Sequence, residues 1–353
     1  MTKKLLFLTT DFSGGGAENV LVQLANYFSL NYEVHYIVLS NKGPNLSKLN
    51  SSIKLFVLNK KSSISSVFKI NKYIRKKNID VAIGTLSMAY AVSLAKLFGN
   101  KKCIYIARLG SIISSNLSEY KLIKKLIMYF YQKTLNFSDK IITQSVAMDN
   151  DLKKYTKKKS TIIYNPISRD RILSLAKENS DIKLDSNFYN IISVGRLASE
   201  KDYKSAILSI SKLKNKIENI RYYILGEGDL KEELIEYSKS LGMSKEIIFL
   251  GYLKNPFPVM KSADVLLLTS LYEGFSNVIL ESLTLNVPVV ATNSPGGNKE
   301  IVSDGMNGFL AKVKDSDDIV DKLLKVNQQK KYEIDVSKFD INIISKEYEK
   351  HFS

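Results

Sequence analysis

The feature that most constrains the fold is a repeated alternation between short apolar runs and longer stretches with helical periodicity. Apolar runs of strand length occur at residues 1–8, 34–39, 53–58, 80–83, 103–107, 140–143 and 161–164. Most of the segments between them carry apolar residues three or four positions apart, as on one face of a helix. This alternation predicts a mainly parallel sheet with helices on both faces.

A second series follows, with strand-like runs at residues 190–194, 222–225, 247–250, 264–269, 287–291 and 308–310. Between the two series, Pro166 lacks a backbone N–H group and disfavours helix at Asn165, which marks a linker. A chain of 353 residues is long enough for two cores. We therefore expect an α/β protein of two doubly wound, Rossmann-like domains, residues 1–166 and 167–330, with ligands bound at the carboxyl ends of the strands.

Two carboxylates eight positions apart, those of Glu273 and Glu281, form the first candidate site. Glu273 follows the apolar run 264–270, and Glu281 lies about one turn inside the helical pattern that begins at Val278. Because a helix rises about 1.5 Å per residue, the carboxylates lie within about 12 Å of each other, a span comparable to a sugar nucleotide. The loop from Gly274 to Asn277 would present N–H groups to an anion. The alternative is that both glutamates are solvated surface residues.

A second candidate site lies at the tight turn after the run 190–194. Arg196 and Lys201 flank this turn. Two fixed cations beside a helix N-terminus suit a diphosphate.

Several short motifs occur in a fixed order. They are Gly14-Gly15-Gly16-Ala17-Glu18, Val194-Gly195-Arg196-Leu197 with Lys201, Gly226-Glu227-Gly228, Glu273 with Glu281, and Gly296-Gly297 with Glu300. In this order and spacing the chain resembles the retaining glycosyltransferases of family four, which have the GT-B fold of two facing domains. The resemblance extends over residues 3 to about 310.

The resemblance implies roles for individual residues. Arg196 and Lys201 would stabilise the departing diphosphate, Glu273 would hold the donor sugar, and Glu281 would hold the ribose. Further donor contacts are implied for Gly15, Gly16, Gly226, Leu253, Gly274, Phe275, Ser276, Asn277 and Val278. It also implies a helix within residues 331–353 that returns to the first domain, retention of the anomeric configuration, no metal and no cofactor. The implied donor is a hexose or N-acetylhexosamine linked to UDP, with a GDP-linked donor as the alternative.

One position departs from the family pattern. Many relatives carry a histidine after a first-domain strand, where this chain has Arg108, and its only histidines are His35 and His351. Arg108 is therefore a candidate contact for an acceptor phosphate. The alternative is a structural ion pair at the end of a strand.

Two Asp-x-Asp triplets, at residues 149–151 and 315–317, raise the possibility of a metal site. Both precede helical patterns, where aspartates favour the N-cap and the first turn. We therefore expect no metal there, and no cluster of His and Cys suggests zinc.

The positive charge is concentrated in the first half of the chain. Residues 1–170 contain 27 Lys and Arg against 9 Asp and Glu, whereas residues 171–353 contain 25 against 26. The resulting +18 favours an anionic partner surface. In residues 119–135, apolar positions form one helical face with lysines opposite: Leu122, Ile123, Leu126, Ile127 and Phe130 against Lys121, Lys124 and Lys125. A second basic stretch, at residues 69–77, surrounds Tyr73 and Ile74.

These features predict a peripheral protein on the inner face of the cytoplasmic membrane. The alternative is that the apolar faces belong to the core and the lysines are only solvated. The family resemblance implies an acceptor that is lipid-linked or a surface polysaccharide. The single cysteine, Cys103, excludes an internal disulfide and favours a reducing cytoplasm, and no apolar run reaches membrane-spanning length. An epimerase of the same fold is one alternative. A basic nucleic-acid-binding protein is another, although no nucleic-acid module is recognisable. An oxidoreductase is disfavoured because the first glycine loop lacks the full dinucleotide-binding spacing.

Overall fold

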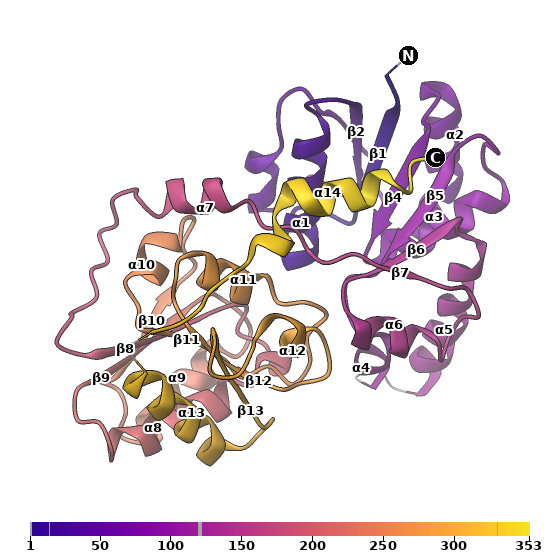
Figure 1. Ribbon diagram of the computed structural model, residues 1–353. Helices are drawn as coiled ribbons and strands as arrows, with labels where there is room; N and C mark the ends of the chain where they lie inside the picture. Colours follow the sequence, from indigo (N-terminus) through magenta and orange to yellow (C-terminus); the bar gives the residue numbers. More distant parts are fainter. Residues whose placement is uncertain (1, 14, 119–121, 330) are drawn as a thin grey trace. The chain divides into compact units, whose positions relative to one another are not determined.

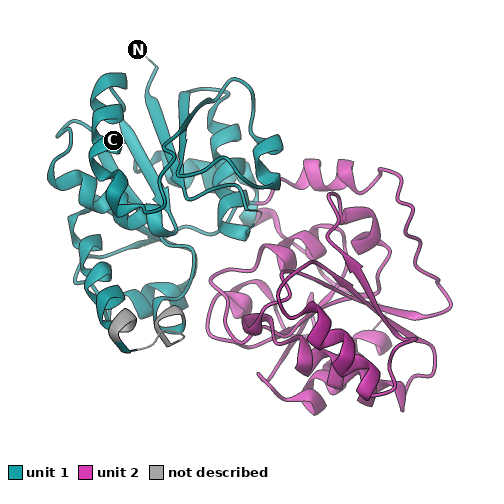
Figure 2. Ribbon diagram, turned by 180° about the vertical axis from the view of Figure 1, so that it is seen from behind, with its two compact units in different colours: residues 1–166, 339–353 teal, residues 167–338 magenta. Residues whose placement is uncertain are grey.

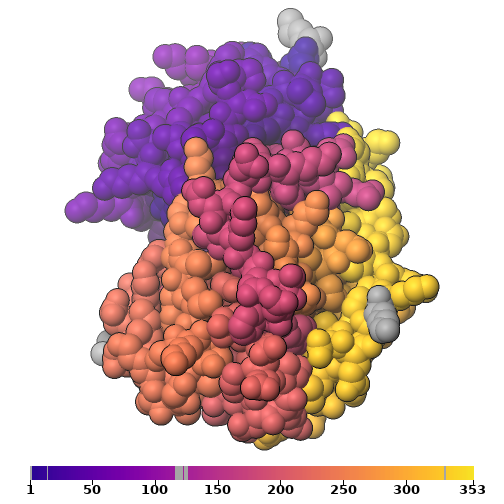
Figure 3. Space-filling model, turned by 90° about the vertical axis from the view of Figure 1, so that its left-hand side faces the viewer, coloured from indigo at the N-terminus to yellow at the C-terminus, as the bar shows by residue number. Residues whose placement is uncertain are grey.

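The computed structural model describes residues 2–13, 15–118, 122–329 and 331–353 and divides the chain into two compact units (Figures 1 and 2). Unit 1 comprises Met1–Pro166 and Phe339–Ser353, and unit 2 comprises Ile167–Lys338. The segment that returns to unit 1 therefore starts at Phe339. The sequence predicted an earlier end of the second domain, at residue 330. Figure 3 shows the last part of the chain, in yellow, at the molecular surface.

Unit 1 is built on a seven-stranded parallel sheet with the order β3-β2-β1-β4-β5-β6-β7. Its strands are β1 (Lys4–Thr9), β2 (Glu33–Val38), β3 (Lys54–Val57), β4 (Val81–Thr85), β5 (Ile104–Arg108), β6 (Lys140–Thr143) and β7 (Thr161–Ile162). The central strand β1 is buried from both sides: Leu5 and Phe7 face one core, and Leu6 and Leu8 face the other. Burial on both faces explains why β1 reads as a continuous apolar run.

Helices cover both faces of this sheet (Figure 1). They are α1 (Gly16–Phe28), η1 (Pro44–Lys48), η2 (Ile64–Ser66), α2 (Val67–Lys77), α3 (Ser87–Leu97), α4 (Ile113–Ser118), α5 (Leu122–Lys133), η3 (Thr134–Phe137), α6 (Val146–Leu152) and, from the C-terminus, α14 (Ile341–Glu349). Buried residues of α1 and α14 share one core, and those of α2 and α3 share another. The C-terminal Phe352 packs edge-on against Phe28 of α1, with ring centroids 5.2 Å apart.

Unit 2 contains a six-stranded parallel sheet with the order β10-β9-β8-β11-β12-β13. Its strands are β8 (Tyr189–Val194), β9 (Ile220–Leu225), β10 (Ile247–Gly251), β11 (Val265–Leu268), β12 (Val289–Thr292) and β13 (Gly308–Ala311). Its helices are α7 (Arg169–Leu175), η4 (Ser199–Lys201), α8 (Tyr203–Lys214), α9 (Lys231–Ser240), α10 (Phe257–Lys261), α11 (Asn277–Thr284), α12 (Asn298–Ile301) and α13 (Ser316–Gln328), and η5 (Ser337–Phe339) runs across the boundary into unit 1.

The architecture confirms the prediction of two doubly wound parallel sheets. Each predicted strand is present, with ends shifted by a few residues at most. In unit 2, residues of α8 and α13 pack with β8, β9 and β11 in one apolar core. In the described part of the chain, no helix combines the length and the apolar character needed to cross a bilayer.

Candidate active site

The strand order of unit 2 locates a crevice between β8 and β11. The chain moves outward from β8 through β9 to β10, and then returns to the other side of β8 with β11. The loops after β8 and β11 therefore leave the sheet in opposite directions. In open α/β sheets, ligands bind at this reversal of strand order, outside the carboxyl ends of the strands.

The loop after β8 carries both predicted cations. Arg196 pairs with Glu200 at 2.5 Å, and its side chain is largely exposed. Lys201 ends the short helix η4, and Asp202 follows in the left-handed conformation, with φ of 47°. The Thr269 hydroxyl at the end of β11 donates to the backbone oxygens of Lys201 and Asp202, at 2.9 and 3.0 Å. These bonds tie the two loops together.

Lys201 and Glu273 form an ion pair across the crevice. Lys201 Nζ lies 2.6 Å from Glu273 Oε1, and the two side chains are 21% and 13% exposed. The Ser270 hydroxyl donates to the same carboxylate oxygen at 2.7 Å. Ser270 is fully buried, and its backbone oxygen accepts the Thr292 hydroxyl at 2.6 Å. The carboxylate is thus fixed by two donors, and a ligand that reaches Lys201 meets Glu273 beside it.

Ser270 was not among the residues predicted from the sequence. Its position three residues before Glu273, at the end of a buried strand, is the signal that was available.

Glycines allow close backbone contacts around this pair. Gly296 has φ of 135°, and a β-carbon there would overlap the backbone oxygen of Glu273. Gly226 has φ of 143°, and a β-carbon there would overlap the backbone oxygen of Gly195. Its N–H donates to the oxygen of Gly251 at 2.8 Å. The loops after β8, β9 and β10 are therefore held backbone to backbone, as only glycine permits at these conformations.

The helix α11 starts directly after the loop that holds Glu273. Ser276 is its N-cap residue, and the Ser276 side chain makes no capping hydrogen bond. The first N–H groups of a helix and its dipole together favour an anion. Gly274 and Phe275 are buried, Asn277 and Val278 form the first helical positions, and Glu281 lies one turn on and is half-buried. Leu253 is half-buried in the loop after β10.

The glycine loop of unit 1 lies at the corresponding end of β1. Gly15 is the N-cap residue of α1 and Gly16 its first residue, while Gly14 lies outside the described residues. The Ser13 hydroxyl donates to Glu18 Oε1 at 3.0 Å, and a β-carbon on Gly15 would overlap the Glu18 carboxylate. Glu18 is nearly buried, so its carboxylate folds back beneath the loop. This positioning of the loop by Glu18 was not foreseen.

Arg108 is a buried structural residue, which corrects its prediction as a contact for an acceptor phosphate. It is 1% exposed, and its guanidinium donates to Tyr348 of α14, to Thr85 of β4 and to Asn165. The distances are 3.0 Å to Tyr348, 3.2 Å to Thr85 and 2.5 Å to Asn165. Because a buried guanidinium must be hydrogen-bonded, these three acceptors account for its position. Arg108 connects β5 to the C-terminal helix.

The two Asp-x-Asp triplets serve local structure. Asp315 is the N-cap of α13 and accepts the N–H of Asp318 at 3.0 Å. Asp149 lies in the first turn of α6 and pairs with Lys153, and Asp151 pairs with Lys154. Burial tends to raise the pKa of both aspartates, but hydrogen bonds, with Lys153 and Ser160 for Asp149 and with Ser114 and Lys154 for Asp151, lower each on balance. Within the described ranges, no group of three His, Cys, Asp or Glu side chains could hold a metal ion.

Known families and proteins match nearly the whole chain. Residues 14–171 match "Glycosyltransferase Family 4", and residues 176–339 match "Glycosyl transferases group 1". A relative from Campylobacter jejuni, N-acetylgalactosamine-N,N'-diacetylbacillosaminyl-diphospho-undecaprenol 4-alpha-N-acetylgalactosaminyltransferase, is 30% identical over 334 residues, which cover 88% of this chain and 86% of the relative. The chain belongs to glycosyltransferase family 4.

Other members of the family extend this comparison. A second Campylobacter jejuni relative, a GalNAc-alpha-(1->4)-GalNAc-alpha-(1->3)-diNAcBac-PP-undecaprenol alpha-1,4-N-acetyl-D-galactosaminyltransferase, is 27% identical and covers 91% of this chain, with 88% of its own length matched. The crystal structure of HepE from Anabaena in complex with UDP and glucose superposes with a TM-score of 0.79 at 18% identity, covering 99% of this chain and 98% of HepE. At that identity the likeness establishes the GT-B fold of this glycosyltransferase.

Proposed function

We propose that this glycosyltransferase transfers a hexose or N-acetylhexosamine from a UDP-linked donor to a lipid-linked or polysaccharide acceptor in surface glycan synthesis. The observation that carries the proposal is the ion pair between Lys201 and Glu273 beside the N-terminus of α11. The bond to be broken joins a diphosphate to a sugar. A lysine beside it can bind the diphosphate, and an adjacent carboxylate can accept hydrogen bonds from the sugar hydroxyls.

In the proposed reaction, the bond between the anomeric carbon and the diphosphate oxygen breaks, and the electron pair remains on the diphosphate. Lys201, Arg196 and the N–H groups near Ser276 would stabilise the developing negative charge. The N–H groups are held in place by the start of α11, so they stabilise this charge without reorganisation. Glu273 would accept hydrogen bonds from sugar hydroxyls, and Glu281 from the ribose. An acceptor hydroxyl oxygen would form the new bond to the anomeric carbon with the donor's configuration kept, and its proton would pass to the departing diphosphate. We assign no protein nucleophile.

The relatives support the choice of substrates. The two Campylobacter jejuni proteins are named for acceptors that carry diphospho-undecaprenol, and both transfer N-acetylgalactosamine. HepE is crystallised with UDP and glucose. We extend these two features, an undecaprenol-linked acceptor and a uridine nucleotide donor, to this chain.

A screen of UDP-, GDP- and ADP-sugars tests the donor, and transfer to a diphospho-undecaprenol-linked sugar tests the acceptor. We expect hydrolysis or binding only with a UDP-sugar, transfer with the anomeric configuration retained, and full activity in EDTA. Conversion of the UDP-sugar to its epimer without an acceptor would replace this proposal with an epimerase. Loss of transfer in EDTA that added metal restores would contradict the metal-independent mechanism.

We further propose that unit 1 attaches to the inner face of the cytoplasmic membrane through α5. Several of its apolar side chains point into solvent: Leu122 is 82% and Phe130 63% exposed, and Leu126 and Ile127 are also exposed. The sequence left open whether this face belongs to the core, and such exposure favours a lipid interface. Lys121 lies outside the described residues, as do the side chains of Ile123, Lys124 and Lys125.

Flotation with vesicles that contain anionic lipid tests this attachment. We expect the protein to float at low salt and to be released at high salt, since screening weakens the contribution of the lysines. Replacing Lys121, Lys124 and Lys125 with Gln is expected to reduce flotation and leave UDP binding intact. Wild-type protein that stays in the soluble fraction at low salt would overturn the membrane proposal and favour a soluble acceptor.

A further inference from the structure

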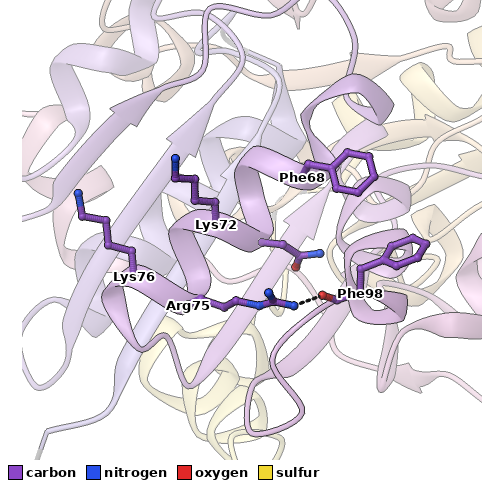
Figure 4. Close-up of a pocket in the computed structure, with 6 residues that line it drawn as sticks. Phe68, Lys72, Arg75, Lys76 and Phe98 are labelled. Atoms are coloured by element: carbon purple, nitrogen blue, oxygen red, sulfur yellow. Dashed lines mark hydrogen bonds between the residues drawn. The ribbon is translucent and has the colours of Figure 1, made fainter.

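Two phenylalanines stand exposed next to each other on unit 1. Phe68, in the first turn of α2, is 73% exposed, and Phe98, directly after α3, is 56% exposed. Their ring centroids are 6.0 Å apart. Arg75 Nη2 donates to the backbone oxygen of Phe98 at 2.5 Å, which fixes the end of α3 against α2 (Figure 4). A fixed pair of exposed aromatic rings is a feature of interaction sites rather than of a solvated surface.

The same helix carries a row of cations. Five exposed basic residues lie on α2, and the segment contains no acidic residue: Lys69, Lys72, Arg75, Lys76 and Lys77. Among the residues that the structure describes, none of the five forms an ion pair with a carboxylate, whereas Lys96 of α3 pairs with Asp139 at 2.9 Å. The helix dipole accounts for cations in the last turn, but Lys69 and Lys72 precede that turn.

The rings and the cations border one open hollow. Its lining is Phe68, Asn71, Lys72, Arg75, Lys76 and Phe98, and its volume is 730 Å³. Figure 4 shows the side chains of Lys72 and Lys76 extending to the same side of α2, with the two rings together near the start of the helix. The two rings and the two lysines therefore border different parts of the same hollow.

The apolar residues that the sequence suggested for this stretch lie elsewhere. Ile74 is fully buried in the core, and the Tyr73 hydroxyl is hydrogen-bonded to His35 Nδ1 at 2.8 Å. Of the two possibilities that the sequence left open for Tyr73 and Ile74, core or interface, the structure shows that Ile74 belongs to the core. The exposed apolar side chains beside these basic residues are those of Phe68 and Phe98.

We propose that this α2–α3 surface, defined by Phe68, Phe98, Lys69, Lys72, Arg75 and Lys76, docks on an anionic phospholipid bilayer as a second contact, separate from α5. The rings would enter the boundary between headgroups and acyl chains, and the cations would meet lipid phosphates. The inference deepens the proposed function, since a bilayer is where a lipid-linked acceptor resides. It assigns a second attachment point to unit 1.

A bilayer fits this surface better than a nucleic acid because the neighbouring exposed groups are aliphatic. The segment before α2 is joined to α5 by a hydrogen bond of 3.1 Å between Ser63 and Tyr131, and the Tyr131 ring lies against Tyr90 of α3 at a tilt, with centroids 4.7 Å apart. Ile64, next to Ser63, is exposed, as are Leu122, Leu126 and Ile127 of α5. Single-stranded nucleic acids are bound mainly through stacking on aromatic rings, whereas a bilayer takes up aliphatic side chains as well.

The test uses the full chain and vesicles of phosphatidylcholine with or without phosphatidylglycerol. Lys72→Gln with Lys76→Gln is expected to weaken binding to the anionic vesicles about 30-fold, since each lysine near an anionic surface contributes about fivefold. Phe68→Ser with Phe98→Ser is expected to weaken binding to the anionic vesicles at low salt as well, because no ring then enters the boundary between headgroups and acyl chains. The matched control is Lys183→Gln with Lys245→Gln, which changes the charge equally at exposed positions of unit 2.

Three outcomes would overturn the proposal. One is equal weakening by the control pair, which would mean that only net charge matters. Another is unchanged vesicle binding in both α2–α3 variants, with unfolding temperatures that show them to be folded. The third is displacement from vesicles by glycerol phosphate, or binding to single-stranded DNA as tight as to vesicles. UDP affinity, measured in parallel, separates this proposal from the transferase proposal: vesicle docking without UDP binding would contradict only the latter.

Discussion

Replacing Lys201 with alanine removes one half of the ion pair at the crevice of unit 2. In the free protein Lys201 Nζ lies 2.6 Å from Glu273, and both side chains are largely shielded from water. If the donor diphosphate takes over Lys201, the lost contact is a charge-assisted hydrogen bond, which contributes about 1.5–3 kcal/mol. We therefore expect Lys201→Ala to weaken UDP binding by about 10- to 150-fold.

The ion pair also predicts an asymmetry between its two members. Before Lys201 can bind a diphosphate, it must give up part of its interaction with Glu273. Glu273→Gln removes this competition, so UDP affinity is expected to stay the same or to rise. The UDP-sugar is expected to bind more weakly, because the charged acceptor for its hydroxyls is lost. Glu281→Ala, by contrast, would weaken UDP and UDP-sugar alike.

Titration calorimetry with UDP and a UDP-sugar measures these effects directly. Lys204→Ala is the matched control, since Lys204 lies three residues further on and pairs with Glu233 at the surface. Thermal unfolding establishes that each variant is folded. Unchanged UDP affinity in folded Lys201→Ala protein would refute the assignment of Lys201. If Glu273→Gln weakened UDP and the UDP-sugar equally, as Glu281→Ala is expected to do, the assignment of Glu273 to the sugar would be refuted.

Three further predictions follow from residues outside this pair. Gly296→Ala is expected to lose UDP-sugar binding and to unfold at a lower temperature than the control Gly242→Ala. Both glycines have positive φ, but only a β-carbon on Gly296 would overlap a neighbour. Equal unfolding temperatures of the two variants would contradict this reasoning. Tyr348→Phe is expected to lower the free energy of unfolding by about 1.5–3 kcal/mol, since it leaves a buried donor of Arg108 without its acceptor, and denaturant unfolding measures this change. Burial lowers the pKa of His35, so the unfolded chain binds a proton that the folded chain does not, and stability is expected to fall as the pH drops below about 6.5. His35→Gln is expected to reduce that slope, and a slope identical to that of the wild type would exclude His35 as its source.

The fold could be predicted from the sequence because its strands are buried on both faces. Leu5 to Leu8 alternate between two cores, and each position is therefore apolar. Ladder pairing in both sheets is parallel throughout, as strand and helix alternation requires. The short helix α12 was less apparent, because its four residues are too few for any periodicity.

The local chemistry was only partly predictable. Glu273 and Lys201 were identified, but their contact depends on the reversal of strand order, which brings residues 72 positions apart to 2.6 Å. Arg108 was misjudged because one of its acceptors, Tyr348, follows 240 positions later. The exposure of α5 and of Phe68 could not be derived either. An amphipathic helix has the same pattern whether its apolar face meets a core or a bilayer.

The placement of α14 has a consequence for biosynthesis. Unit 2 is, in topological terms, an insertion within unit 1, because the chain leaves unit 1 after Pro166 and rejoins it at Phe339. All of unit 2 is translated before Tyr348 and Phe352, which complete the core around α1 and supply an acceptor to Arg108. During synthesis the domain that begins first is therefore finished last. Until Phe352 leaves the ribosome, Phe28 stays uncovered on one side, and a nascent chain that stalls short of α14 exposes the surface that a chaperone would recognise.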